Sequence, residues 1–324
     1  MPIGCFVSPG RSLERGLQRV KRADSLGFDA AYTTHIAGRD SLSVLMAFAA
    51  ASERIKLGTG VLPIFSRTPV ATAQAAATID EYSGGRMVLG LGVSHQVTVE
   101  NWFGAEITKP VSQMRDYAGA VRAMFRGEDP PQSEFFPTRF RFMGYEPRPD
   151  LPIYIAALSP NMLRLAARIG DGVMLWLCSP AYIRDVVVPE ISAAREGAGL
   201  SMEGFDVVAA VPVGLTGDAE AGRASQRQEL ITYMSLPFYR AMLERSGFGS
   251  EIAAFDEGMA AGDVERAKAG ISDEMLAEIA GIGDEDEVRA AVERYRDAGA
   301  SSPCVGGIPG TDFEGSLEAV SKLL

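Results

Sequence analysis

The sequence predicts a single parallel (β/α)8 barrel, and three observations support this fold class. Short apolar runs alternate with amphipathic helical stretches along the 324 residues, which is typical of parallel strands joined by crossover helices. About eight such units can be counted, which is the number that closes a barrel. The competing architecture, an open doubly wound sheet, usually carries GxGxxG in its first strand–helix turn, where this chain reads SPGRS. We therefore expect one domain over residues 1–324.

The expected strands and helices follow from this alternation. Eight apolar runs predict strands, at Ile3–Val7, Phe28–Tyr32, Ile55–Val61, Met87–Leu91, Ile153–Ala157, Val173–Leu177, Val207–Leu215 and Pro303–Ile308. The helices expected between them cover 12–26, 42–53, 68–82, 112–126, 160–169, 181–197, 219–246, 284–298 and 312–324. Gly27 follows the first helix, as glycines do where a helix ends in left-handed backbone, and we interpret it as structural.

Three segments exceed what a minimal barrel needs, at 95–110, 127–150 and 247–281. Insertions in barrel enzymes commonly cover the active site at the C-terminal ends of the strands. We expect the insertions on that face, although only the first of them directly follows a strand.

Composition restricts the partners and the compartment. The net charge of −11 argues against nucleic acid or an anionic membrane as the main partner, but it leaves an anionic small ligand possible. No apolar run reaches the roughly 20 residues that cross a bilayer, and the first residues do not resemble a signal peptide. The three cysteines lie in apolar stretches and are interpreted as reduced, buried thiols. These features favour a cytoplasmic protein with a small-molecule substrate.

The two histidines of the chain both follow predicted strands. His35 comes after the second strand and His95 after the fourth. Barrel enzymes build their active sites at these strand ends, and histidine exchanges protons readily near neutral pH. Both are therefore candidate catalytic residues. The alternative for each is a loop histidine without a catalytic role.

Glycines alternate in two neighbouring strands. Gly58 and Gly60 share one face of the third strand, and Gly90 and Gly92 share one face of the fourth. Glycine in a strand often marks a bulge or the close approach of a ligand. We expect these glycines to leave a flat recess for a planar ring, the alternative being small-residue packing inside the barrel.

The turn after the fifth strand predicts an anion site. Ser159 suits a helix N-cap and Pro160 suits the first helical position. Free N–H groups and the positive end of the helix dipole would then face the catalytic end of the barrel, where a phosphate could bind. Capping alone explains this sequence equally well.

The stretch LGTGVLPIFSRTPVATAQAAATIDEYSGGRMVLGLGVSH, from Leu57 to His95, resembles the signature region of the luciferase-like (bacterial luciferase family) flavin-dependent oxidoreductases. It is most similar to their deazaflavin-dependent branch. The TTH turn, the ALSPNM turn and RIGDGVMLW extend the resemblance more weakly over the chain. The motif indicates the family and not the substrate.

The resemblance implies a cofactor ring across the C-terminal mouth of the barrel. A non-prolyl cis peptide would back the ring, at Gly60–Val61 in this chain, and the ring and its ribityl chain would contact Val93 and Ser94. His35 matches the acid/base position, but Thr34 stands where the family often has aspartate. The phosphate would meet the turn after the fifth strand, at Ala157, Leu158, Ser159 and Asn161.

The resulting functional expectation is an oxidoreductase that transfers a hydride between bound coenzyme F420, an 8-hydroxy-5-deazaflavin, and a small organic substrate. The alternative within the family is an FMN-dependent monooxygenase that uses dioxygen and a separate flavin reductase. The family commonly forms homodimers, and we expect one here.

Three alternatives lie outside this chemistry. A metal-dependent hydrolase needs clustered ligands, which two histidines on separate strands do not supply, so no metal site is expected. A Schiff-base enzyme needs a lysine at the catalytic end of a strand, whereas Lys56 begins its strand. A coenzyme-binding protein without turnover remains open.

Overall fold

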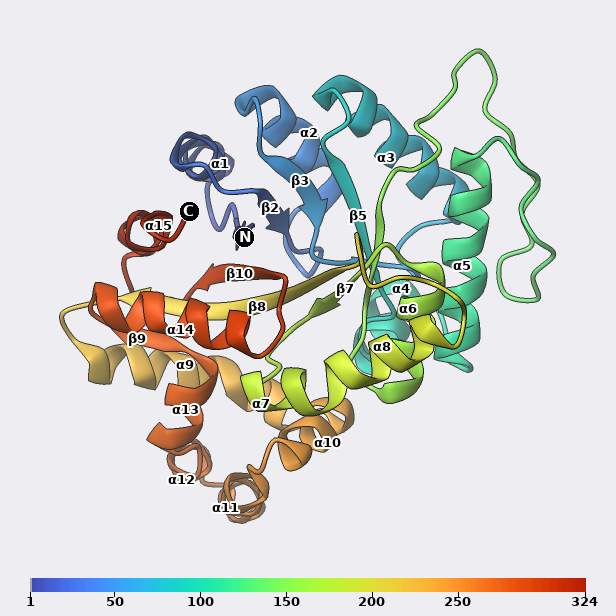
Figure 1. The fold of residues 1–324 in the computed structure, drawn as a ribbon. Helices are drawn as coiled ribbons and strands as arrows, with labels where there is room; N and C mark the ends of the chain where they lie inside the picture. Colours follow the sequence, from blue (N-terminus) through green and yellow to red (C-terminus); the bar gives the residue numbers. More distant parts are fainter. Residues whose placement is uncertain (1) are drawn as a thin grey trace.

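A closed barrel of eight parallel strands forms the centre of the computed structural model, which describes residues 2–324 (Figure 1). The barrel strands are β1 (Gly4–Phe6), β2 (Ala30–Thr33), β3 (Lys56–Thr59), β5 (Met87–Gly92), β6 (Ile153–Ala156), β7 (Gly172–Leu175), β8 (Asp206–Leu215) and β10 (Ser302–Gly307). They pair in this order, and β10 closes the ring by pairing with both β1 and β8. Each strand falls within or beside a predicted apolar run, so the predicted fold class is confirmed. Two short strands, β4 (Leu62–Pro63) and β9 (Gly281–Gly283), extend the ladders of β5 and β8.

Helices surround the barrel (Figure 1). They are α1 (Leu13–Leu26), α2 (Ser41–Ala51), α3 (Pro69–Ser83), α4 (Gln96–Phe103), α5 (Pro110–Phe125), α6 (Pro160–Ile169), α7 (Pro180–Tyr182), the π-helix η1 (Ile183–Val187), α8 (Val188–Glu196), α9 (Ala219–Met234), α10 (Pro237–Arg245), α11 (Gly249–Ala260), α12 (Val264–Ala269), α13 (Asp273–Ile279), α14 (Glu285–Asp297) and α15 (Phe313–Ser321). The helix expected over 219–246 is two helices, because Pro237 has no backbone N–H and begins α10. Among residues 2–324, no helix is both long enough and apolar enough to span a bilayer.

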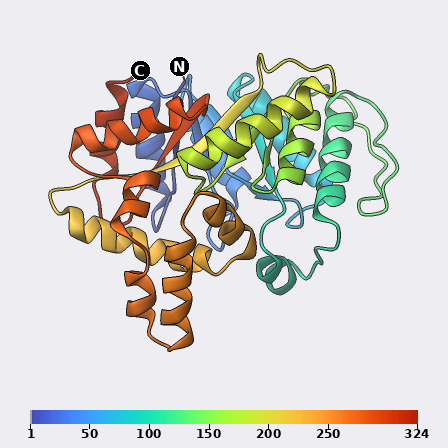
Figure 2. The ribbon, with the colours of Figure 1, turned by 60° about the horizontal axis from the view of Figure 1, so that its bottom comes forward.

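Two of the three predicted insertions lie at the C-terminal end of the barrel. The first contains α4, which follows β5, and the third contains α11, α12 and α13, which lead into β9 beside the end of β8. In Figure 2 these helices extend from one end of the molecule, and the two chain termini lie at the other. The prediction for these two segments is confirmed.

The insertion at 127–150 lies elsewhere, so its expected position on the C-terminal face is wrong. Tyr145 donates a hydrogen bond to the carbonyl of Ala77 in α3 (2.9 Å), and Arg148 pairs with Asp80 of the same helix through two bonds of 2.9 and 2.8 Å. The segment follows the C-terminus of α5, which in a βα unit lies at the N-terminal ends of the strands. It therefore packs against α3, away from the C-terminal mouth.

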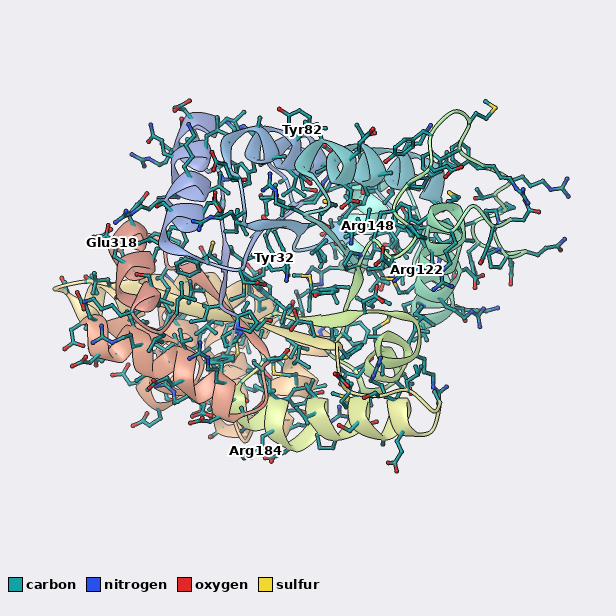
Figure 3. The ribbon with its side chains drawn as sticks, turned by 45° about the horizontal axis from the view of Figure 1, so that its top comes forward. Tyr32, Tyr82, Arg122, Arg148, Arg184 and Glu318 are labelled. Carbon is teal, nitrogen blue, oxygen red and sulfur yellow. The ribbon has the colours of Figure 1, made fainter. Side chains whose placement is uncertain are left out.

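The barrel has two apolar cores. One fills the space between the strands and the helices. The other fills the barrel interior with inward-facing side chains: Ala30, Tyr32, Val88, Tyr154, Met174, Val208 and Cys304, with Phe6 and Val61 packed against them. Tyr32 lies at the centre of the ring of strands, whereas Arg184 and Glu318 lie on the outside of the molecule (Figure 3). The interior is thus a packed core rather than a channel, as expected for a barrel of eight strands.

A buried carboxylate joins α1 to the turn before β3. Asp24 accepts hydrogen bonds from the backbone N–H groups of Glu53 (2.8 Å), Arg54 (3.2 Å) and Ile55 (2.8 Å). Burial opposes the ionisation of Asp24, but these three donors outweigh it and hold the pKa of the carboxyl below its usual value. The charged form of Asp24 therefore stabilises the N-terminal end of the barrel.

Replacing Asp24 with asparagine is expected to lower the free energy of unfolding by about 2 kcal/mol at pH 7, because one acceptor oxygen is lost and buried N–H groups stay unpaired. The folded pKa of Asp24 is lowered, so the contribution of its charge is complete above the unfolded pKa and is lost as the pH falls through the folded pKa. The difference between variant and wild type should then shrink below about pH 4. Urea unfolding across pH measures this, and the exposed Asp297→Asn is the control, with an expected change under about 0.5 kcal/mol. A constant difference at all pH values would contradict the role of the charge.

Candidate active site

Strand β3 bends into the barrel mouth through a bulge. Gly58 pairs with Val88, and the next pair is Leu62 with Leu91. The chain thus advances four residues from Gly58 while β5 advances three, so this segment carries one extra residue. The extra residue is accommodated where the Gly60–Val61 peptide bond is cis. The cis bond that the resemblance implied is confirmed, and the bulge presents half-buried backbone at the C-terminal end of the barrel.

The glycines of β3 and β5 do not leave an empty recess. A Cβ at Gly58 would lie 2.5 Å from the ring of Tyr32, and one at Gly90 would lie 2.0 Å from the carbonyl oxygen of Thr59 and 2.6 Å from the sulfur of Met174. Both glycines are fully buried inside the barrel. The prediction of an open recess is therefore wrong at these two positions, because neighbouring side chains and backbone already fill the space.

The two glycines nearer the mouth are also packed against side chains. A Cβ at Gly60 would lie 2.5 Å from the ring of Phe6, and one at Gly92 would lie 2.5 Å from Val61. Small-residue packing thus accounts for all four glycines. The surface that the bulge offers to a planar ring is the exposed part of Gly60 and Val61.

Ser94, two residues after β5, has an unusual backbone conformation. Its φ of 64° lies in the left-handed region, which non-glycine residues seldom occupy. Leu177, at the end of β7, has a φ of 56°. Backbone of this kind clusters at functional sites, where the surrounding structure enforces it. Both residues lie at the C-terminal mouth.

His35 is fixed by the first turn of α2. The backbone N–H of Ser41 donates to its Nδ1 (3.3 Å), and the Ser41 hydroxyl lies 3.0 Å from the same atom. A nitrogen that accepts a backbone N–H carries no proton, so the neutral ring holds its proton on Nε2. Burial lowers the pKa of His35, Arg67 lowers it further, and Asp40, 3.9 Å away and paired with Arg67, opposes both. At neutral pH His35 is therefore an uncharged N–H donor.

His95 lies in a different environment. It precedes α4 without making a side-chain capping bond, and its ring packs 5.9 Å from that of Tyr239 in α10. Burial lowers its pKa. His95 thus contacts the helices above the mouth, while His35 is held by α2.

The N-terminus of α6 has the predicted cap. The Ser159 hydroxyl accepts the N–H of Met162 (3.4 Å), and Pro160 occupies the first turn. Ala157 donates its N–H to the carbonyl of Met174, and the carbonyl of Leu158 accepts a bond from a tyrosine hydroxyl. The side chain of Asn161 accepts a bond from Arg164 (3.3 Å). The backbone N–H groups of Leu158, Ser159 and Asn161 remain available for an anion.

The predicted residues therefore lie along one arc of the mouth, at the ends of β2, β3, β5 and β6. No contact described in the structure joins His35 to His95. The residues of 2–324 contain no cluster of three or more histidine, cysteine or acidic side chains that could hold a metal ion.

A cavity of about 380 Å³ opens on the other arc of the mouth. Strands β1, β2, β7, β8 and β10 supply its floor and walls, and α9 supplies its roof. Its lining includes Phe6, Ser8, Arg19, Tyr32, Thr34, Trp176, Leu177, Gln226, Glu229, Leu230, Tyr233, Ile308, Thr311 and Phe313. A volume of this size suits a small organic molecule.

Aromatic rings connect the cavity to the β3 bulge. Phe6 packs edge-on against Trp176 (5.3 Å between centroids) and at 5.8 Å from Tyr32, and Tyr233 lies 6.5 Å beyond Trp176. Phe6 is also the ring that fills the space beside Gly60. The cavity and the bulge thus share one aromatic wall, and a molecule in the cavity would lie beside a ligand on the bulge.

Sequence reasoning missed most of this cavity. Phe6 is the last residue of β1 and Ser8 follows the strand, so both could have been found by the same strand-end argument that selected His35. Gln226 lies in the middle of α9 and Tyr233 lies near its C-terminal end, and no local pattern separates them from other polar helix residues.

Comparison with known proteins decides the family. The sequence profile of the luciferase-like monooxygenases matches residues 1–302. The chain belongs to this family. The luciferase-like family is one of oxidoreductases, and this member is an enzyme with the family's α/β barrel.

Two relatives of this luciferase-like chain are reductases. The 5,10-methylenetetrahydromethanopterin reductase of Archaeoglobus fulgidus is 31% identical over 310 residues, which cover 94% of this chain and 92% of the relative. The structure of the coenzyme F420-dependent tetrahydromethanopterin reductase from Methanopyrus kandleri superposes with a TM-score of 0.85 at 25% identity, covering 99% and 97% of the two chains.

The same fold also occurs with FMN. The oxygenating constituent of the 3,6-diketocamphane monooxygenase from Pseudomonas putida, solved in complex with FMN, superposes with a TM-score of 0.70 at 16% identity and covers 99% of this chain and 97% of its own. This similarity concerns the fold alone.

Proposed function

We propose that this enzyme transfers a hydride between coenzyme F420 and a small organic substrate. The observation that carries the proposal is the β3 bulge at Gly60 and Val61, whose continuation β4 pairs with the end of β5 just before Ser94. The similarity to two reductases, one of them F420-dependent by name, supports the deazaflavin over FMN.

The residues of the mouth fit such a coenzyme. Exposed backbone at Gly60 and Val61 would support the flat ring system, with Gly92, Val93 and Ser94 beside it. The free N–H groups at the start of α6 and the helix dipole would hold the phosphate. When bound, the deazaflavin supplies or accepts a hydride, and the protein provides binding and orientation.

His35 supplies a proton-bearing group on the same arc. Its Nε2–H is directed by the bond that Ser41 makes to Nδ1. A neutral imidazole held in this way donates a hydrogen bond to an oxygen atom that gains negative charge during the reaction. We assign His35 this role, and we assign His95 a supporting one through its contact with Tyr239.

The cavity is the place for the substrate. It shares the aromatic wall of Phe6 and Tyr32 with the bulge, so a bound molecule would lie next to the coenzyme ring. Apolar walls also exclude water, which would otherwise compete with the substrate. A homodimer located in the cytoplasm completes the proposal.

A binding titration tests the coenzyme. Oxidised coenzyme F420 and FMN are titrated separately into the purified protein, and the quenching of ligand fluorescence is followed. We expect the dissociation constant for F420 to be at least about tenfold lower than that for FMN, a difference of about 1.4 kcal/mol. Tighter binding of FMN would favour the alternative, a monooxygenase that uses dioxygen and a flavin reductase. Binding of neither would contradict the ring site.

A variant at the start of α6 tests the phosphate position. Asn161→Asp keeps the size of the side chain and its bond to Arg164, but it adds a negative charge. We expect about tenfold weaker F420 binding, because two like charges a few ångströms apart at a protein surface repel by about 1 kcal/mol or more. The control is Met143→Asp, since Met143 is 93% exposed in the 127–150 segment. Equal affinities of the two variants would place the phosphate elsewhere.

A further inference from the structure

We propose that the cavity selects an uncharged, largely apolar substrate and that Gln226 of α9 binds its polar group. This inference rests on the proposed function, because it describes the substrate of the same site. It excludes phosphorylated and carboxylated molecules as good substrates. Three features of the cavity lead to it.

The first feature is the lack of an available cation. Among residues 2–324, Arg19 is the one positively charged residue in the lining. Its Nε donates to Glu314 at 2.8 Å, and its guanidinium stacks over the ring of Phe313. A carboxylate, the exposed Glu229 of α9, also lines the cavity. An anionic substrate would therefore enter a pocket without a free counter-charge, which is strongly unfavourable.

The second feature is the apolar wall. Most of the lining is apolar or aromatic: it includes Phe6, Tyr32, Trp176, Leu230, Ile308 and Phe313. Aromatic surfaces favour flat, weakly hydrated molecules over sugars and other polyhydroxylated compounds.

The third feature is an amide without a protein partner. Gln226 is only 4% exposed and lines the cavity. Its side chain makes no hydrogen bond within residues 2–324, and its amide atoms are not fully enclosed by protein, so they open on the cavity. A ligand in the cavity would satisfy it. Because the amide carries both a donor and an acceptor, it suits an uncharged carbonyl or hydroxyl group.

The experiment uses the cavity's own tryptophan as a reporter. The chain has two tryptophans, Trp102 and Trp176, and only the second lines the cavity. In a Trp102→Phe background, fluorescence reports on Trp176 alone. Acetophenone is titrated as the neutral probe and 4-acetylbenzoate as its carboxylated counterpart, with free tryptophan correcting for absorption by the probes. The titrations are run with and without saturating F420.

We expect acetophenone to quench Trp176 saturably and 4-acetylbenzoate to bind at least about tenfold more weakly. Gln226→Leu should weaken acetophenone binding by about fivefold, the effect of one net hydrogen bond. Gln228→Leu is the matched control, because Gln228 is an exposed glutamine of the same helix and should change nothing. Glu229→Gln should reduce the difference in affinity between acetophenone and 4-acetylbenzoate, because it removes the negative charge.

Each outcome separates this inference from the proposed function. Tighter binding of the anion, or equal effects of Gln226→Leu and Gln228→Leu, would overturn the inference even if F420 binds tightly. If the probes bind with the expected affinities but F420 does not bind, the inferred substrate preference of the cavity holds and the proposed coenzyme is refuted. Absence of saturable quenching by either probe in a protein that binds F420 would also overturn the inference.

Discussion

Replacing His35 with alanine is expected to lower kcat/KM by at least about 100-fold, with the ketone that the wild type reduces fastest as substrate. The dissociation constant of F420 should change by less than about threefold, because the proposed ring and phosphate contacts lie on β3, β5 and α6. Steady-state kinetics and the fluorescence titration measure the two quantities separately. Full activity of this variant would refute the role of His35.

Two further variants distinguish donation by Nε2 from a general structural effect. His35→Gln offers an amide N–H near the position of Nε2 and should recover about tenfold of the lost activity, consistent with the value of one hydrogen bond to a charged group. Ser41→Ala removes the hydroxyl beside Nδ1 but keeps the backbone N–H that fixes the tautomer, so its effect should be small. A loss in Ser41→Ala as large as that in His35→Ala would show that the hydroxyl, and not the backbone, orients the ring.

The pH profile provides an independent measurement. The structure lowers the pKa of His35 from the 6.5 of an unperturbed histidine side chain, chiefly through burial. The neutral form should therefore persist to below pH 6.5, and activity should fall only at more acidic pH, when His35 becomes protonated. The same depression means that protonation also destabilises the folded state in that range. In His35→Gln this acid limb of kcat/KM should disappear.

Replacing Gly90 with alanine is expected to destabilise the protein by about 3 kcal/mol or more, or to prevent its folding. The added Cβ would lie 2.0 Å from the carbonyl oxygen of Thr59 and 2.6 Å from the sulfur of Met174. The methionine can move, but the carbonyl belongs to β3, and the Thr59 hydroxyl donates to the carbonyl of Gly90 itself (2.7 Å). Relief of the clash would require the two strands to separate.

A glycine at the end of β10 is the matched control. A Cβ at Gly306 would meet Phe6 at 3.8 Å, an ordinary contact, so Gly306→Ala should change stability by less than about 1 kcal/mol. Urea unfolding followed by circular dichroism measures both variants. Similar stabilities would show that β3 and β5 are less rigid than the packing indicates.

Local patterns in the sequence predicted the barrel well and the contacts between its strands poorly. Apolar runs and helix caps are properties of neighbouring residues, so all eight strands and the Ser159 cap could be anticipated. The partner of Gly58 could not, because its pairing with Tyr32 depends on the register between β2 and β3. The sequence showed that Gly58 has no side chain, but it did not show that the ring of Tyr32 fills the space beside it.

In the candidate site, too, local features could be predicted from the sequence and tertiary contacts could not. His35 could be selected because it follows a strand, yet its tautomer depends on Ser41, six residues away at the start of α2. The α9 side of the cavity could not be predicted, since α9 reaches the cavity only through tertiary packing. The position of 127–150 could have been predicted, because the segment follows the predicted helix 112–126, and such a helix ends at the N-terminal ends of the strands.

In helix α9, the residues that line the cavity are different from those that bind the helix to its neighbours. Positions 226, 229, 230 and 233 line the cavity, whereas Arg227 binds the carbonyl of Ile271 (2.9 Å) and pairs with Asp273, and Ser225 donates to the carbonyl of Pro309 (2.7 Å). The side chains that would recognise a substrate are thus not those that hold the helix in place. For directed evolution, a library confined to four positions of one helix could change which compounds are reduced while the barrel that supports the chemistry stays intact.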